Sequence, residues 1–332
     1  KESLEDCHFK GGKDMLSLYG NNFPFSDMYN GKGLMLGGTI KESEFGNYKD
    51  GDLSAILLDK FPFWVNYHRI PDIETALMGE WEEKLEQIAK QAVKENITNL
   101  TGIPSWMLIL LKRVLAISGK KTITEVWPNL ELYMHGGVNF EPYREQFKAL
   151  IPSNKMNYLE GYNASEGFIG IQDRSPSKGL LLMLDYGIFY EFIPMHNYRK
   201  GILTAIPLKD VQLNIDYALV ISTNGGLWRY LIGDVIRFTT LSPFRIEIIG
   251  RTKSFLNAFG EELIVENTDK ALLTTCRNHK ASIKDYTVAP VFIDDSSGRH
   301  QWFIEFTNPP KDISLFTKEL DKNLQALNSD YA

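Results

Sequence analysis

Apolar stretches that end in glycine alternate with amphipathic stretches through the first two-thirds of the chain. Residues 33–39 (GLMLGGT) and 130–140 (LELYMHGGVNF) each predict a strand that runs into glycines. Residues 73–96 predict one amphipathic helix, whose apolar positions recur at steps of three or four: Leu77, Trp81, Leu85, Ile88 and Ala92. The repeated order of strand, glycine loop and helix indicates an α/β architecture with parallel strands.

A second helix is expected after a short strand that ends at Thr101. Ser105 is placed to cap this helix, which is apolar on nearly every side, and Gly119 is expected to end it. Residues 102–105 are suited either to lining a ligand pocket or simply to starting the helix. We interpret Lys112, Arg113 and the acid-rich face of residues 74–86 as solvated surface.

The pattern changes after about residue 180. Between 180 and 238, strand-like segments follow one another with little helix, which predicts an antiparallel subdomain. Beyond Arg251 the chain predicts a compact α+β part, with a helix near 262–277, two strands and a helix from Asp312. The buried face of that last helix is predicted to be Phe316, Leu320, Leu324 and Leu327.

Composition narrows the class of protein. The chain has 332 residues, 43% of them hydrophobic, which allows two or three folded units. A net charge of −6 without a dense basic run does not support nucleic-acid binding. The two cysteines lie far apart in the sequence and form no disulfide framework, so we expect the protein in the reducing cytoplasm. We expect no membrane partner, because the most apolar helix is short and interrupted by charge.

One polar turn raises a question of function. The segment 161–173 (GYNASEGFIGIQD) places a Tyr, an Asn, a Ser and a Glu between two strand-like runs. It could be an ordinary solvated turn, since Gly and Asn favour turns. Alternatively, Ser165 and Glu166 are held at the rim of a sheet to meet a ligand.

Three motifs occur in a fixed order, and together they are specific. They are YNASE at 162, RYLIGD at 229 and GRTKSFLNAFGEEL at 250. The sequence resembles the adenylate-forming superfamily, and within it the auxin-responsive Gretchen Hagen family of acyl-acid amido synthetases. The segments HGGVNFEPYREQF, LWRYLIGDV and HQWFIEF also carry this resemblance. The resemblance covers essentially the whole chain and is expected to be to a bacterial-type member.

The resemblance implies a large adenylating domain, with mostly parallel sheets, helices and an antiparallel β subdomain, followed by a small α+β domain. We expect residues 1–249 in the large domain, a hinge at 250–254, and the small domain at 255–332. The family's Ser/Thr/Gly-rich phosphate loop and a late Lys-bearing segment are not found. Because the chain opens at Lys1, we expect it to be a fragment that lacks both.

The resemblance also implies the chemistry. Such enzymes join a carboxylic acid to the α-phosphate of ATP, release pyrophosphate, and pass the acyl group to an amino acid. Mg²⁺ held by carboxylates and phosphate oxygens would ease the approach of two anions. Glu166 is then the metal ligand and Ser165 a donor to the α-phosphate. Tyr162 offers a ring to adenine, and Asn163 is included as a cofactor-binding residue.

Further roles follow from the other motifs. Asp234 is expected to accept from both ribose hydroxyls, although a structural Gly-Asp turn competes with this reading. Gly136 and Gly137 would let the backbone approach the nucleotide, unless they serve only a strand-end turn. By position Lys253 matches the family's hinge residue and Arg251 stays with the nucleotide, the alternative being an ordinary linker.

Two alternative functions remain open. An acid–thiol ligase would share the adenylation step and differ in the acceptor. A non-catalytic homologue would keep the fold without turnover. The histidines His68 and His135 are expected to be satisfied by neighbours rather than catalytic. Neither the acid, the amine nor the oligomeric state follows from the sequence.

Overall fold

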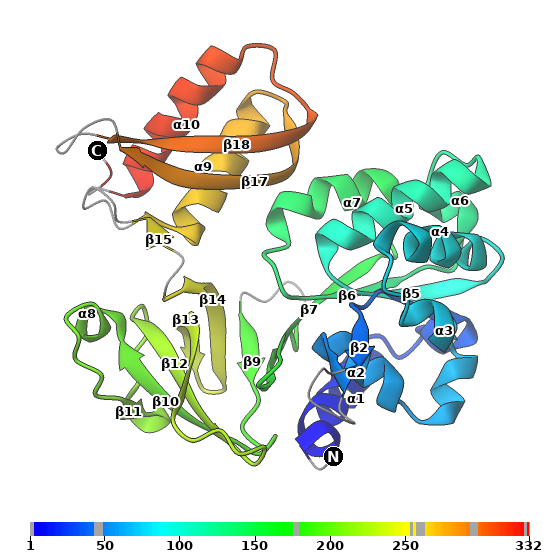
Figure 1. The fold of residues 1–332 in the computed structure, drawn as a ribbon, viewed down its shortest axis with the longest axis horizontal. Coiled ribbons are helices and arrows are strands. Elements are labelled where there is room, and N and C mark those ends of the chain that lie inside the picture. The colour runs from blue at the N-terminus through cyan, green and yellow to red at the C-terminus, as the bar shows by residue number, and fades with distance from the viewer. Residues whose placement is uncertain are drawn as a thin grey trace. The chain divides into compact units, whose positions relative to one another are not determined.

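The chain divides into two compact units, and each is described by itself. Unit 1 comprises Lys1–Phe189 with Thr223–Gly226, and unit 2 comprises Tyr190–Ser222 with Leu227–Ala332. The computed structural model in Figure 1 describes residues 3–42, 49–174, 179–252, 255–256, 263–292, 298–328 and 331. No helix within these ranges is both long and apolar enough to cross a membrane.

Unit 1 is built on a mostly parallel sheet. Its strands lie in the order β9-β8-β7-β6-β5-β1-β4. Neighbours from β4 to β7 run parallel, whereas β7 to β8 and β8 to β9 are antiparallel. The strands are β1 (Lys32–Met35), β4 (Arg69–Ile70), β5 (Ile97–Thr101), β6 (Leu132–His135), β7 (Asn157–Ala164), β8 (Gly167–Ile171) and β9 (Leu180–Leu182), with a separate hairpin of β2 (Ile40–Glu42) and β3 (Lys49–Gly51).

Helices cover this sheet. In Figure 1, the group α4 to α7 lies on one side of β5 and β6, and α1 and α2 lie on the other. The helices are η1 (Leu4–Phe9), α1 (Lys10–Asn22), η2 (Met28–Asn30), α2 (Leu53–Lys60), η3 (Phe63–Tyr67), α3 (Ile73–Ala76), α4 (Trp81–Ala92), α5 (Pro104–Ser118), α6 (Ile123–Val126), η4 (Glu141–Tyr143) and α7 (Arg144–Leu150). The core of unit 1 includes Leu34, Leu100, Leu111 and Tyr133, all fully buried.

Two helical predictions in unit 1 are corrected. The single helix expected over 73–96 is broken into α3, which Asp72 caps at its start, and α4, because Gly79, a poor helix former, lies in the break. Helix α5 is not capped by Ser105. It begins at Pro104, whose fixed φ and missing N–H suit a first helical position. Gly119 ends it in the left-handed conformation (φ 66°), as predicted.

Unit 2 contains an antiparallel sheet followed by an α+β part. The sheet runs β11-β10-β12-β13-β14, with β10 (Ile188–Pro194) beginning at the boundary of the unit. Its other elements are α8 (Met195–Tyr198), β11 (Ile206–Pro207), η5 (Leu208–Asp210), β12 (Asp216–Thr223), β13 (Tyr230–Leu241) and β14 (Phe244–Arg251). The later elements are β15 (Phe255–Leu256), β16 (Leu263–Ile264), α9 (Val265–Asn278), β17 (Ser282–Phe292), β18 (Gly298–Asn308) and α10 (Ile313–Leu327).

The parallel and antiparallel sheets confirm the predicted α/β class. In the last part, β17 pairs with β18 and the strands pack beside α9 and α10 (Figure 1). Asp312 caps α10 by accepting from the backbone N–H groups of Ser314 and Leu315. Phe316, Leu320 and Leu324 are buried as predicted, but Leu327 is 42% exposed, since α10 ends there.

Candidate active site

The turn that raised the question of function joins β7 to β8. Ala164 and Gly167 face each other across the two strands, so Ser165 and Glu166 alone form the connection. Ser165 is exposed and Glu166 is half-buried. A two-residue hairpin connection is tight and fixes the register of both strands. The hydroxyl and the carboxylate are therefore presented side by side at the end of a rigid ribbon.

The turn offers one carboxylate, that of Glu166, to a metal ion. No cluster of three or more His, Cys, Asp or Glu side chains suited to a metal occurs among the described residues. An all-protein cage is therefore not formed there. Mg²⁺ characteristically uses only one or two protein carboxylates and takes its other ligands from phosphates and water. Glu166, accessible at the turn, is compatible with that mode.

Tyr162 lies differently from its neighbours. It lies near the end of β7 and is only 7% exposed, whereas the next residue, Asn163, is exposed. Most of the Tyr162 ring is therefore covered in this structure. Stacking on adenine requires ring surface that is free, so the predicted role of Tyr162 stays a prediction.

The glycines at the carboxyl ends of the parallel strands have packing reasons of their own. A Cβ on Gly136 would lie 2.3 Å from the Gly161 carbonyl oxygen on β7. Gly137 has a φ of +82°, in the left-handed region that favours glycine. The strand-end turn thus explains both residues, and their contact with a nucleotide stays a prediction.

His135 immediately precedes these glycines and departs from expectation. It is 6% exposed, and its Nδ1 has no hydrogen-bond partner within the described part of the chain. Its ring stacks on Phe140 with centroids 4.1 Å apart. Burial, helped by the positive charge of Arg144, lowers the pKa of His135 to about 3. The expectation that neighbours satisfy this histidine is therefore wrong at Nδ1, since the rings of Tyr133 and Phe140 pack beside it.

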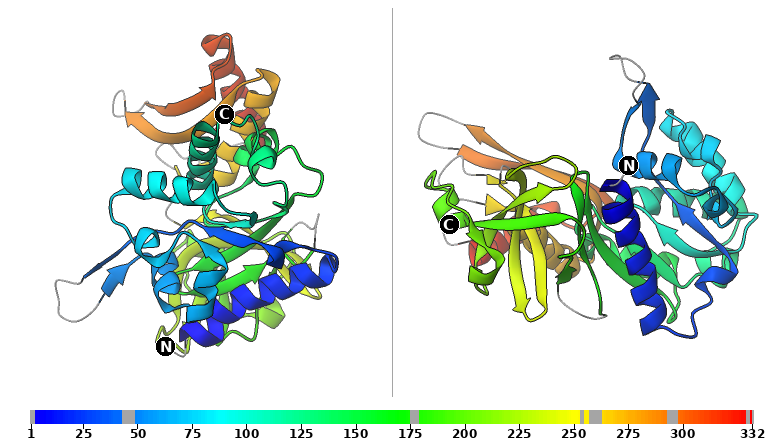
Figure 2. Two further views of the ribbon diagram at one scale, coloured as in Figure 1. Left: turned by 90° about the vertical axis from the view of Figure 1, so that its right-hand side faces the viewer. Right: turned by 90° about the horizontal axis from the view of Figure 1, so that it is seen from below.

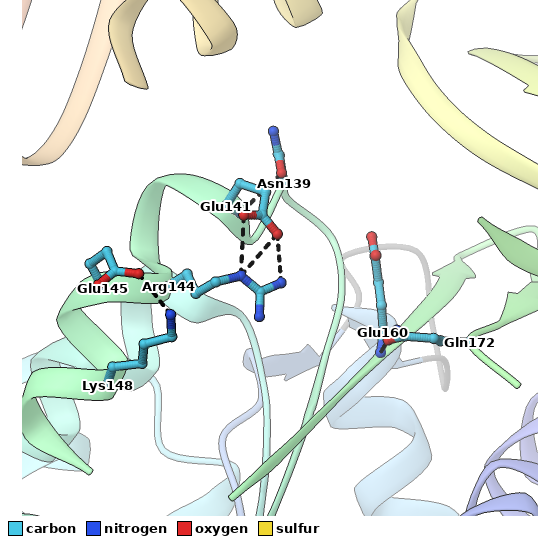
Figure 3. A network of polar contacts seen from close by, with 7 residues as sticks. All are labelled: Asn139, Glu141, Arg144, Glu145, Lys148, Glu160 and Gln172. Carbon is cyan, nitrogen blue, oxygen red and sulfur yellow. Dashed lines mark hydrogen bonds and ion pairs between the residues drawn. The ribbon is translucent and has the colours of Figure 1, made fainter. Parts of the chain in front are cut away.

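Charged side chains surround the loop that follows Gly137. Figure 3 shows Arg144 bound to Glu141 and Lys148 bound to Glu145, with Nε of Arg144 2.9 Å from Oε1 of Glu141. The Arg144 guanidinium also lies 4.9 Å from the centre of the Phe140 ring. Glu160 and Gln172, on β7 and just after β8, exchange backbone and side-chain hydrogen bonds. This network fixes the edge of the sheet next to His135.

A pocket of about 310 Å³ opens at the carboxyl end of β1. Its lining residues are Gly37, Gly38, Thr39, Asp52, Trp81, Lys84 and Trp106. The rings of Trp81 and Trp106, both half-buried, lie 5.0 Å apart between centroids. An apolar or aromatic group of a small molecule suits these walls.

Lys84 beside this pocket was missed by the sequence reading. It is fully buried, and its Nζ donates to the carbonyl oxygens of Gly37 and Gly38 at 2.8 and 2.7 Å. Burial lowers the pKa of this ammonium, while Asp52 acts in the opposite direction. The acidic side chains of residues 74–86 are exposed or half-buried, as predicted, whereas Lys84 lies on the buried side of the helix. The single Lys inside an acid-rich amphipathic segment was the only signal in the sequence.

In unit 2, Asp234 and Arg251 are cross-strand neighbours on β13 and β14. Nε of Arg251 lies 3.2 Å from Oδ1 of Asp234, and its Nη2 donates to the Ile232 carbonyl at 3.1 Å. Gly233, which precedes Asp234 within β13, has a φ of +90°, in the region that favours glycine. The structure thus brings Asp234 and Arg251 together, and it brings Tyr162, Asn163, Ser165 and Glu166 together in unit 1. Lys253 lies outside the described residues.

The GH3 family N-terminal domain model matches residues 8–156, the central domain model matches 181–251, and the C-terminal domain model matches 266–332. Indole-3-acetic acid-amido synthetase GH3.4 of Arabidopsis thaliana is 27% identical over 184 residues, which cover 49% of this chain and 30% of that protein. Indole-3-acetic acid-amido synthetase GH3.8 of Oryza sativa subsp. indica is 27% identical over 181 residues, covering 50% and 29%. The matched stretches therefore span about a third of these relatives.

Solved structures share the fold. GH3.15 acyl acid amido synthetase superposes with a TM-score of 0.75 at 16% identity, over 98% of this chain and 68% of that one. A 2-hydroxyisobutyryl-CoA ligase in complex with an acyl-AMP gives a TM-score of 0.61 at 12% identity, over 90% and 60%. The fold is thus that of adenylate-forming enzymes. With all three of its domain models matched in order, the chain belongs to the GH3 family.

Proposed function

We propose that the protein is an ATP-dependent ligase that adenylates a carboxylic acid and transfers the acyl group to the amine of an amino acid. The observation that carries the proposal is the two-residue turn of Ser165 and Glu166 in a chain of the GH3 family. The named relatives are amido synthetases, which supports this reaction over others.

The turn supplies groups that adenylation needs. Attack of a carboxylate on the α-phosphate brings two anions together, so the barrier is largely electrostatic. The Ser165 hydroxyl can donate to a phosphate oxygen, and the Glu166 carboxylate can hold Mg²⁺. When bound, that ion neutralises phosphate charge. Because both side chains sit on a tight turn, little reorganisation is needed when charge develops.

Asp234 and Arg251 are assigned to the nucleotide. The Asp234 carboxylate, held by Arg251 at 3.2 Å, is of the type that accepts from ribose hydroxyls. Asn163 adds exposed amide groups, while Tyr162 would have to expose more of its ring. Gly136 and Gly137 line the same edge of the unit 1 sheet, so their backbone could also approach ATP.

The apolar part of a substrate has a candidate place in the pocket walled by Trp81 and Trp106. Since the Lys84 ammonium is occupied by two carbonyl groups, we assign the pocket to an uncharged ring or chain rather than to the reacting carboxylate. Residues 102–105 lead into α5, which carries Trp106.

The two half-reactions need different groups around one acyl-adenylate. We assign residues 1–249 to adenylation, the hinge to 250–254 and the small mobile domain to 255–332, with Lys253 as pivot and catalytic residue. We also place the enzyme in the cytoplasm, supported by two free, buried cysteines.

The experiment is pyrophosphate exchange with a panel of carboxylic acids, followed by addition of amino acids or coenzyme A. Exchange that depends on a particular acid, followed by amide formation, supports the proposal. Thioester formation with coenzyme A would identify the acid–thiol ligase. No exchange with any acid, in a full-length protein shown to be folded, would favour the non-catalytic homologue.

A further inference from the structure

The strand ladder next to the Ser165–Glu166 turn is irregular. The register of β7 and β8 shifts between Tyr162 and Asn163, after which Asn163 faces Phe168. Such a shift leaves backbone groups that the ladder does not pair regularly. The Phe168 N–H, at this point, donates to the Sγ of Cys7, at 3.1 Å. A thiol from a segment 161 residues away thus completes the ladder.

The next residue along the chain contacts the other member of the same cross-strand pair. His8 Nδ1 lies 2.7 Å from Oδ1 of Asn163. Because an amide oxygen only accepts, the proton of the neutral ring is assigned to Nδ1. The contact fixes the orientation of the carboxamide, and the NH₂ group of exposed Asn163 is left for another partner.

Cys7 and His8 are held firmly. They are 3% and 5% exposed and lie in η1, the short helix that leads into α1. A Cβ on Gly11 would lie 2.4 Å from the Phe168 ring, so α1 packs directly against β8. Figure 2 shows the blue N-terminal helix beside the green strands of this hairpin. The Tyr186 hydroxyl donates to Asp14 of α1 at 2.7 Å, and the Tyr186 ring packs edge-on against Phe168.

We propose that Cys7 and His8 are positioning residues for the Ser165–Glu166 turn. One residue holds Phe168 after the turn and the other holds Asn163 before it, so the base of the hairpin is clamped from one side. The clamp sets where Ser165, Glu166 and the Asn163 NH₂ group meet the nucleotide. This inference rests on the proposed function, and neither Cys7 nor His8 touches substrate.

The test compares removal with conservative replacement. Cys7→Ala and His8→Leu remove the contacts, whereas Cys7→Ser keeps an acceptor and His8→Gln keeps a donor. Tyr186→Phe is the control, because it removes a hydrogen bond to α1 but keeps the ring that packs edge-on against Phe168. The measurements are kcat and KM of pyrophosphate exchange, ATP affinity by calorimetry, and hydrogen exchange of the peptide covering 161–171.

Removal should lower kcat by about 10- to 100-fold, because small displacements of catalytic groups have effects of this size. ATP affinity should change less than about threefold, since most nucleotide contacts remain. Hydrogen exchange of the hairpin amides should rise about tenfold or more. The conservative variants should restore most of the kcat and most of the protection from exchange. The double variant His8→Leu with Asn163→Ala should be no slower than Asn163→Ala alone, because His8 acts through Asn163.

Three results would overturn the inference. They are unchanged hairpin exchange in both removal variants, equal loss of kcat in Tyr186→Phe, and additive effects of His8→Leu and Asn163→Ala. The proposed function fails separately, if the unaltered protein shows no pyrophosphate exchange with any acid. Hydrogen exchange of the hairpin still tests in that case whether Cys7 and His8 hold it in place, because this measurement does not depend on catalysis.

Discussion

Arg251 lies directly opposite Asp234 on neighbouring antiparallel strands, with its Nε 3.2 Å from Asp234 Oδ1. The Asp234 side chain is 15% exposed and that of Arg251 is 61% exposed. The carboxylate is therefore set in place by a partner that remains open to solvent. The proposed contact of Asp234 with the ribose leads to a prediction for nucleotide binding.

Replacement of Asp234 by Ala is expected to weaken nucleotide binding. The ribose is remote from the reacting carboxylate, so its contacts are similar in the ground and transition states. KM for ATP should rise with kcat nearly intact in pyrophosphate exchange. Glu191→Ala is the matched control, because it removes another ion pair of unit 2, with Arg229, to which no ligand is assigned. A collapse of kcat at constant KM would show that Asp234 is misassigned.

Glu166→Gln keeps the shape of the side chain and removes its charge. Metal-supported adenylation should fall by roughly 10²–10³-fold, about 3–4 kcal/mol, as for loss of one electrostatic contact in the transition state. Initial rates of exchange at saturating ATP measure this. Glu145→Gln, at an exposed ion pair with Lys148, should have no effect. An unchanged rate in Glu166→Gln refutes the role, and a variant that does not fold assigns Glu166 to structure instead.

Lys84→Met should destabilise unit 1. The change leaves the carbonyl oxygens of Gly37 and Gly38 buried without their donor, and each unpaired acceptor costs about 1–3 kcal/mol. Relief of the buried charge offsets part of this, so the free energy of unfolding should fall by about 2–3 kcal/mol. Urea denaturation measures it, with Lys90→Met on the exposed side of α4 as control. A Lys84→Met protein as stable as the unaltered one would contradict this account of the loop after β1.

His135 should make stability depend on pH. Its pKa is about 3 in the folded chain, against about 6.5 for an unperturbed histidine, so the unfolded chain binds more protons between these values. The free energy of unfolding therefore falls as the pH is lowered from 6.5 toward 3, by at most about 1.4 kcal/mol per pH unit for one proton. His135→Gln should flatten this part of the curve, whereas His68→Gln, at an exposed site, should not. Parallel stability curves for His135→Gln and the unaltered protein would contradict the burial argument.

Lys253→Pro tests the hinge. Proline fixes φ near −65°, so one of two backbone states should become inaccessible. One half-reaction should be spared and the other blocked when adenylation and acyl transfer are timed separately in single turnovers. Lys253→Ala separates loss of the side chain from loss of backbone freedom. Equal slowing of both half-reactions, or of neither, would exclude Lys253 as the pivot.

Local pattern was enough to predict most elements of the fold. The glycine-ended strands became β1 and β6, and the antiparallel subdomain became β10 to β14, because periodicity and glycine placement act over a few residues. The break between α3 and α4 was missed, since an apolar repeat continues across Gly79. The start of α5 was misplaced because Pro104 outweighed the adjacent Ser105.

Long-range contacts could not be read in the same way. The turn of Ser165 and Glu166 is predicted from its residues, but the contacts of Cys7 with Phe168 and of His8 with Asn163 span more than 150 positions. The burial of Lys84, and the absence of a partner for His135 Nδ1 among the described residues, likewise depend on the elements that pack against them. The catalytic roles of Ser165 and Glu166 stay predictions, because the same turn geometry can serve different ligands.

Acyl transfer itself tests the central claim most directly. The full-length protein would be incubated with ATP, Mg²⁺, a panel of carboxylic acids and a mixture of amino acids, and the products identified by mass spectrometry. The account predicts an N-acyl amino acid together with equal amounts of AMP and pyrophosphate, all lost when the acid is omitted. Release of ADP and phosphate, or acyl transfer to coenzyme A in preference to an amino acid, would contradict it.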